Sequence, residues 1–198
     1  RLEVSQYNPY VPPSQIDYNM RSPLFADGTN LPCKGYPRGP AVATYKAGDT
    51  VLVVMDGNTF HEGGHCQISI SYDDRTFVTI YTVMDGCFTK TGTNFTVTIP
   101  PTTPKCDGCT LAWSWVNAIG NREFYMNCVD VRITNTIATS QQRLVGKNYT
   151  VANLPGYPFI PEFPPSTYKG HDIYDAAKTV TVGLSTTSTA TSTSTTRP

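Results

Sequence analysis

The segment 61–65, with the sequence HEGGH, places two histidines four residues apart on either side of a glutamate. On a helix this spacing brings both imidazoles to one face, where they can bind zinc while the glutamate acts as a general base. Two glycines within such a helix would each cost roughly 1 kcal/mol relative to alanine. The flanking segments 51–55 and 66–72 have the composition of strands. We therefore interpret 61–65 as a loop between strands and not as the helix of a zinc protease.

The segment 120–128, with the sequence GNREFYMNC, carries a carboxylate and a phenol two residues apart. Side chains alternate between the two faces of a strand, so Glu123 and Tyr125 share one face while Phe124 lies on the other. This arrangement suits a site on the surface of a sheet. A buried tyrosine beside an ordinary surface carboxylate would show the same period.

The chain has six cysteines, an even number that is typical of disulfide-bonded proteins from an oxidising compartment. Several pairings are possible, and the sequence does not choose between them. Cys66 and Cys87 bracket two consecutive strand candidates, and the segment 106–109 can close a short loop. A Cys-x-x-Cys pair can also serve redox chemistry or half of a zinc site, but no second pair and no βαβ pattern accompanies it. We expect the disulfides Cys66–Cys87, Cys106–Cys109 and Cys33–Cys128.

Short strand signals recur along the chain, and no segment shows a sustained helical period. Apolar and polar residues alternate in 66–72 and 95–99, as they do in strands with one buried face. Turn-forming pairs such as Asp107-Gly108 separate the candidates. The expected strands are 50–55, 66–72, 77–83, 94–99, 110–116 and 123–133. Regularly spaced short strands predict an all-β fold, an antiparallel immunoglobulin- or fibronectin-like β-sandwich with long loops and disulfide staples.

The regions outside these strands are rich in proline, glycine and tyrosine. Residues 1–45 are expected to form a long loop over the sandwich, and residues 138–180 an extended strap around it. From 185 to 196 nearly every residue is serine or threonine, a composition that cannot bury apolar surface. We predict one domain over residues 1–183 and a disordered tail over 184–198, which is either an O-glycosylated stalk or a plain linker.

The composition also bears on partners and location. The 15 basic residues balance 15 acidic ones, which gives no reason to expect nucleic acid or an anionic membrane surface as a partner. The longest apolar run, 51–55, is too short to span a bilayer. The chain begins with Arg1 and not with methionine, and it carries glycosylation sequons at Asn94 and Asn148. Together with the cysteines, these features predict a secreted glycoprotein, which we expect to be a monomer.

Several separate motifs together resemble one family. They are SPL at 22–24, LPCKGY at 31–36, FHEGGHCQ at 60–67, WSWVN at 113–117 and GNREFYMNC at 120–128. The combination resembles the lytic polysaccharide monooxygenases, and most closely the chitin-active fungal enzymes of auxiliary activity family 11. The resemblance extends over about residues 1–135.

The resemblance implies a copper site. In the family, an N-terminal histidine supplies its amino group and its ring, and a second histidine supplies another ring nitrogen. Arg1 stands at the first of these positions and His61 at the second. Tyr125 takes the position that is axial to the copper, and Glu123 lies beside it. The family has a small residue where this chain has His65, which is a departure.

The arginine at the first position changes the expected chemistry. Arginine donates hydrogen bonds and has no lone pair to give to a metal, and its charge repels a metal cation at short range. We therefore expect a secreted, wall- or surface-associated relative that has lost the copper brace, holds no cofactor and does not cleave polysaccharide oxidatively. Its expected partner is a cell-wall polysaccharide, and Arg1 is expected to pair with Glu123.

Two alternatives remain open from the sequence. The chain could be an active copper enzyme that cleaves chitin or a related glycan. It could also be a copper-trafficking protein that binds the metal through His61 and His65. Tyrosines of the N-terminal loop such as Tyr7, Tyr10 and Tyr18 could stack on sugars, or they could equally pack on the sandwich.

Overall fold

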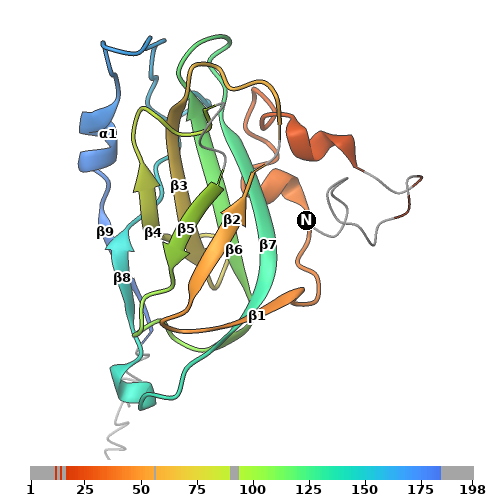
Figure 1. Cartoon of the computed structure of the whole chain (residues 1–198), viewed down its shortest axis with the longest axis vertical. Coiled ribbons are helices and arrows are strands. Elements are labelled where there is room, and N and C mark those ends of the chain that lie inside the picture. The colour runs from red at the N-terminus through yellow and green to blue at the C-terminus, as the bar shows by residue number, and fades with distance from the viewer. Residues whose placement is uncertain (1–11, 13, 15–16, 56, 90–93, 184–198) are drawn as a thin grey trace, which may run out of the picture.

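The fold is built from strands, and its helical elements are short (Figure 1). The computed structural model describes residues 12, 14, 17–55, 57–89 and 94–183. Arg1, Tyr7, Tyr10 and the tail 184–198 lie outside the described residues, so the expectations placed on them stay predictions. Within the described ranges, no helix is both long and apolar enough to cross a membrane.

A five-stranded sheet forms the centre of the molecule, with the strand order β1-β7-β6-β3-β4. Its members are β1 (Ala43–Lys46), β3 (Gly64–Ser71), β4 (Phe77–Val83), β6 (Cys106–Asn117) and β7 (Tyr125–Thr134). Neighbouring strands are antiparallel, except that β1 pairs parallel with β7 at the edge. Every residue of β3 is buried, because strands flank it on both sides and protein covers both of its faces.

A second layer consists of β2 (Thr50–Val54) and β5 (Asn94–Thr98), an antiparallel pair that lies across one face of the large sheet (Figure 1). Residues of β5 alternate between exposed and buried, as expected for a strand with one solvent face. Phe95 and Val97 of β5 belong to the same hydrophobic core as Trp113 and Trp115 of β6. These two layers confirm the predicted all-β sandwich.

The opposite face of the large sheet is covered by irregular chain. Segments that precede β1 and follow β8 bury apolar side chains against β6 and β7, which creates a second core. Its members include Leu24, Phe124, Met126, Ile160 and Phe163. From here on, the name strap is used for residues 151–175, the part of the predicted segment 138–180 that packs on this face.

Several short elements were not expected from the sequence. Besides β1, they are β8 (Leu144–Lys147), β9 (Thr179–Val182), the helix α1 (His171–Asp175) and 3-10 turns at Tyr18–Arg21, Cys33–Gly35 and Thr139–Gln141. β8 and β9 pair with each other as an antiparallel two-stranded sheet. Elements of three to five residues are too short to show a helical or strand period, and the three strands among them pair with distant chain.

The turn expected at Asp107-Gly108 is a bulge inside β6. The pairing of β6 with β7 shifts its register between Asp107 and Cys109. Gly108 has a φ of +86°, which glycine adopts without strain and other residues do not. The residues that predicted a chain reversal therefore bend a strand without ending it.

Two disulfides tie a covering segment and a loop to strands of the large sheet, and the third lies within one strand. Cys33–Cys128 joins the segment before β1 to β7, Cys66–Cys87 joins β3 to the loop after β4, and Cys106–Cys109 spans the bulge. The structure thus has the three pairs that were expected, and none of its cysteines is free.

Candidate functional site

A tight turn just before β3 presents His61. His61 and Glu62 both have positive φ values, 47° and 58°. The backbone N–H of Gly63 closes the turn by donating to the carbonyl of Phe60 at 2.9 Å. Gly63 and Gly64 follow with φ values of +98° and +125°, which favour glycine. These conformations exclude a helix, and the zinc-protease interpretation with it.

The ring of His61 lies against a tryptophan and a glycine. Its centroid is 5.8 Å from that of Trp115. A Cβ atom on Gly120 would come within 2.9 Å of Nδ1, so only glycine leaves the ring enough space. Among the described residues, none forms a hydrogen bond with the ring. The nitrogen Nε2 is therefore available as a ligand.

Tyr125 opens β7 beside the same tryptophan, with its ring centroid 4.7 Å from that of Trp115. Its hydroxyl donates a hydrogen bond to Glu123 Oε2 at 2.7 Å. Burial, and after it this hydrogen bond, raises the pKa of Tyr125 well above its ordinary value. The phenol therefore keeps its proton at neutral pH and holds the carboxylate of Glu123 in place.

These side chains share one cavity. His61, Trp115 and Tyr125 all line a space of about 930 Å³ between β2 and the large sheet. The structure thus brings together His61, Tyr125 and Glu123, which the sequence analysis had singled out. Arg1 lies outside the described residues, so its position at this face and its pairing with Glu123 stay predictions.

Two further side chains hold the loop 117–122, which carries Gly120. Arg122 donates to backbone carbonyls of this loop, and Glu162 Oε1 accepts the backbone N–H of Gly120 at 2.6 Å. Neither side chain has a role that was predicted from the sequence. Arg122 lies within the motif 120–128, which could have drawn attention to it. Glu162 belongs to the strap, and no local pattern connects it with His61.

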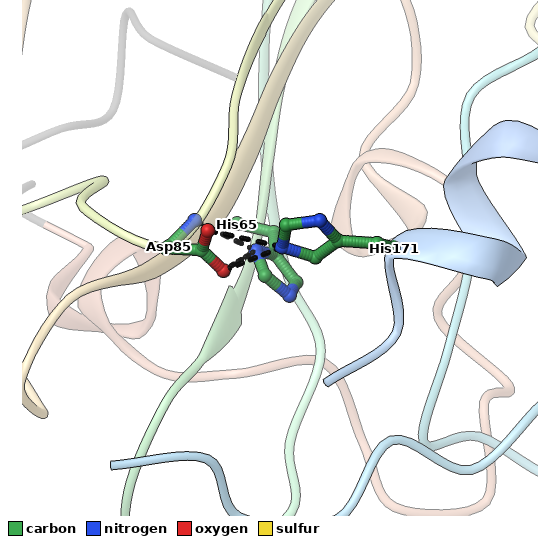
Figure 2. Close-up of side chains that lie close together, drawn as sticks. All are labelled: His65, Asp85 and His171. Atoms are coloured by element: carbon green, nitrogen blue, oxygen red, sulfur yellow. Dashed lines mark hydrogen bonds and ion pairs between the residues drawn. The ribbon is translucent and has the colours of Figure 1, made fainter. Parts of the chain in front are cut away.

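His65 lies on the opposite side of the large sheet from His61. Its ring is fully buried and stacks on Phe163 of the strap, with centroids 4.4 Å apart and planes at 9° to each other. Figure 2 shows His65 together with Asp85 and His171. His171 Nε2 lies 2.8 Å and 3.0 Å from the two carboxylate oxygens of Asp85.

This cluster of His65, Asp85 and His171 has the residue types of a metal site, and its ligand atoms lie within 4.8 Å of one another. Both ring nitrogens of His65 are already used, however. Nδ1 accepts the backbone N–H of Asp85 at 2.9 Å, and Nε2 donates to the carbonyl of Lys169 across 2.6 Å. A lone pair that accepts a hydrogen bond cannot bind a metal at the same time.

The cluster instead fastens the strap to the sheet. Burial lowers the pKa of His65, which favours the neutral ring that makes both hydrogen bonds. The copper-trafficking interpretation needed His61 and His65 at one ion. The rings of these two histidines contact different cores, Trp115 in one case and Phe163 in the other, so this interpretation is not supported.

Comparison with known proteins points to one group of relatives. No protein-family model matches the chain. An AA11 family lytic polysaccharide monooxygenase A of Aspergillus fumigatus is 43% identical over 139 residues, which are 68% of this chain and 62% of the relative. An AA11 family lytic polysaccharide monooxygenase of Aspergillus oryzae is 35% identical over 158 residues, or 68% of this chain and 37% of the relative. A monooxygenase B of the same family from A. fumigatus is 34% identical over 154 residues, or 67% and 36%.

These relatives correct one expectation. The chain was expected to hold no cofactor, yet its relatives are AA11 lytic polysaccharide monooxygenases, which are copper-dependent. That expectation depended on Arg1 alone, which lies outside the described residues. The described part of the site fits a copper ligand, because His61 has a free ring nitrogen in the cavity that Tyr125 also lines. The chain spans less than two thirds of the length of each of these relatives.

Proposed function

Because this chain is a lytic polysaccharide monooxygenase-like protein related to the AA11 family, we propose that it binds a polysaccharide with the face that carries His61, and that this face takes up a copper ion. The relatives are named for action on polysaccharides, and that class of substrate is the one we propose for this chain. The proposal concerns the sandwich itself, since the relatives contain further chain that it does not match.

One observation carries the proposal, namely that His61 and Tyr125 both pack against Trp115 although they lie far apart in the sequence, with Glu123 hydrogen-bonded to Tyr125. His61 would hold the copper through its free ring nitrogen. Tyr125, which the resemblance implies would lie beside the ion, keeps Glu123 hydrogen-bonded through its protonated hydroxyl. Copper, when bound, would supply one-electron redox chemistry.

Exposed aromatic side chains of the strap support the proposed binding of sugars. Tyr157 and Phe159 are 46% and 65% exposed. The next residue, Ile160, accepts a hydrogen bond from Arg122 through its carbonyl, so this part of the strap lies directly beside the loop that contacts His61. Aromatic rings with an exposed apolar face are suited to stacking on pyranose rings. Tyr18, 64% exposed, offers a similar surface on the N-terminal side.

We further propose that the protein is secreted and glycosylated, and that it acts at a cell wall or cell surface. The disulfides support an oxidising compartment. The sequon residue Asn94 is exposed at the start of β5. Asn148 is half-buried, and its side-chain oxygen accepts the backbone N–H of Phe77. Asn94 is therefore the better placed of the two for a glycan.

The experiment combines copper titration with glycan binding. Calorimetric titration with copper should give a site that is lost in His61→Ala and kept in His171→Ala, which removes a histidine outside the proposed face. Pull-down against chitin, β-glucan and mannan should retain the protein on at least one glycan. After incubation of the copper-loaded protein and the glycan with a small-molecule reductant in the presence of oxygen, mass spectrometry of the supernatant distinguishes oxidised oligosaccharides, which indicate cleavage, from their absence, which indicates a binding role without cleavage. A protein that binds neither copper nor any of the three glycans would contradict the proposal.

A further inference from the structure

We propose that Arg122 and Glu162 are positioning residues, which fix the ring of His61 through the loop 117–122 that lies against it. This inference rests on the proposed function, in which His61 is a copper ligand. It adds that the orientation of the ligand is set from the strap side of the sheet, by residues that do not touch the metal.

Arg122 gathers carbonyl groups from the loop and from the strap. Its guanidinium donates across 3.0 Å to Ile160, 3.4 Å to Ala118, 3.2 Å to Gly120 and 2.5 Å to Asn117, in each case to the backbone oxygen. A guanidinium has five N–H groups in a fixed planar arrangement, so it can set the relative positions of several acceptors at once. A lysine ammonium has three donors and no such plane, and it could not hold the same set.

Asn117 completes the arrangement from the end of β6. Its side-chain nitrogen donates to the carbonyls of Ile119 and Asn121, both at 2.9 Å. The carbonyls of all five residues from 117 to 121 therefore point at one of two side chains, Arg122 or Asn117. Backbone oxygens turned inward in this way favour one conformation of the loop, because rotation of any of these peptide groups would break a hydrogen bond to a side chain.

The strap holds the loop from the other side. Glu162 accepts the N–H of Gly120 at 2.6 Å, and the N–H of Phe163 donates to the carbonyl of Ala118 at 3.0 Å. Glu162 thus acts on Gly120, a residue of the loop whose backbone lies against the ring of the histidine. Its side chain is on the surface, so it can be changed without opening a core.

The contact between loop and histidine leaves little freedom. A Cβ on Gly120 would lie 2.9 Å from Nδ1 and 3.2 Å from Cε1 of His61, so this edge of the ring lies close to the backbone of the glycine. The N–H of Ile119 donates to the carbonyl of His61 at 3.1 Å. The ring and the backbone of His61 thus both contact the same loop. A displacement of the loop would therefore displace His61.

The test compares variants of the full chain, first without metal. Glu162→Ala and Arg122→Lys should each shift or broaden the imidazole NMR signals of His61 and lower copper affinity by about tenfold, which is the usual effect of removing a partner that orients a metal ligand. Glu162→Gln should restore both readouts, because its amide oxygen can still accept the N–H of Gly120. Arg132→Lys is the matched control, since Arg132 pairs with Asp107 at the far end of β7.

The outcomes separate this inference from the proposed function. If the His61 signals of Glu162→Ala stay at the parental positions, the positioning role is wrong, whatever the copper affinity. If Arg122→Lys fails to fold, Glu162→Ala and its rescue by Glu162→Gln decide the question alone. If the signals move as expected but the parent protein binds no copper, the positioning role stands and the copper site fails.

Discussion

At the scale of single residues, the two histidines of the segment 61–65 show how a turn and a strand separate side chains that a helix would bring together. His61 lies in the turn with a φ of 47°, and His65 lies in β3 opposite Val116. The glycines between them predicted the loop correctly. Alternation along 120–128 likewise predicted the common face of Glu123 and Tyr125. The contact of Gly120 with His61 joins two distant segments, and a local pattern carries no information about it.

Gly120→Ala should affect both stability and His61, whereas Gly48→Ala should affect stability alone. The two glycines have nearly the same φ, +100° at Gly120 and +97° at Gly48. The backbone strain of an alanine should therefore be similar at both positions, roughly 1–2 kcal/mol. At Gly120 the new methyl group would also overlap the ring of His61, while nothing lies within 4 Å at Gly48. Chemical denaturation measures the loss of stability in each variant, and the imidazole NMR signals of His61 show whether its ring has moved. Equal behaviour of the two variants would show that Gly120 has no special contact with His61.

Lys34 should make stability rise with pH in the alkaline range. It is a buried ammonium that donates to the carbonyls of Ser22 and Pro23, and burial lowers its pKa to about 8. Between about pH 8 and the ordinary pKa of 10.5 the unfolded chain holds a proton that the folded protein has released, so folding gains stability as the pH rises. Relative to Lys34→Met, the parent should gain up to roughly 3 kcal/mol across this range. Denaturant unfolding of both proteins at several alkaline pH values measures this difference. If the free energies of unfolding of the two proteins changed with pH in the same way, the prediction would be wrong.

At the scale of elements, strands with a clear period were predictable and the covering segments were not. The six strands expected from alternation all occur, although β6 runs through its predicted turn. β1, β8, β9 and α1 have four or five residues each. The three strands pair with distant chain, and Tyr174 of α1 is buried in the second core. The strap shows the same limit, because its contacts with His65 and the loop 117–122 join residues that are far apart in the sequence.

The fastening of the strap should weaken in mild acid. Burial lowers the pKa of His65 below its ordinary value of 6.5, so below about pH 6.5 the unfolded chain takes up a proton that the folded protein does not. Stability should therefore fall as the pH drops, by at most about 1.4 kcal/mol per pH unit from this residue. The free energy of unfolding, measured by denaturant titration between about pH 7.5 and 5, should depend less steeply on pH in His65→Gln than in the parent.

His171→Gln is the control for that measurement. It removes the other histidine of the cluster and leaves the buried ring of His65 with its hydrogen bonds to Asp85 and Lys169. The slope attributed to His65 should therefore persist in His171→Gln. If it disappears there and persists in His65→Gln, the exposed histidine is responsible and the prediction is wrong.

At the scale of the whole molecule, one sheet supports two cores, and the disulfides differ in how much of the chain they constrain. Cys33 and Cys128 are 95 residues apart, whereas Cys106 and Cys109 are separated by 3. The first pair ties a covering segment of the second core to β7, and the second spans a bulge within one strand. Their contributions to stability should differ accordingly.

Replacing Cys33 and Cys128 by alanine should cost far more stability than replacing Cys106 and Cys109. Chain-entropy estimates give about 4–5 kcal/mol for a loop of the first length and about 1.5 kcal/mol for the second. Thermal and denaturant unfolding of the two double variants test the ranking. Similar losses in both would mean that packing around the sulfur atoms, and not loop closure, sets the contribution.

The double fastening of the strap has a consequence for resistance to proteases. Residues 164–169 are exposed throughout, and they lie between Phe163, stacked on His65, and His171, paired with Asp85. A single cut in this stretch would leave each new end anchored, with the later piece also held by the pairing of β9 with β8. All six cysteines precede the cut, so no disulfide would join the two pieces. The nicked protein should migrate as one particle under native conditions and as two chains in detergent, even without a reducing agent.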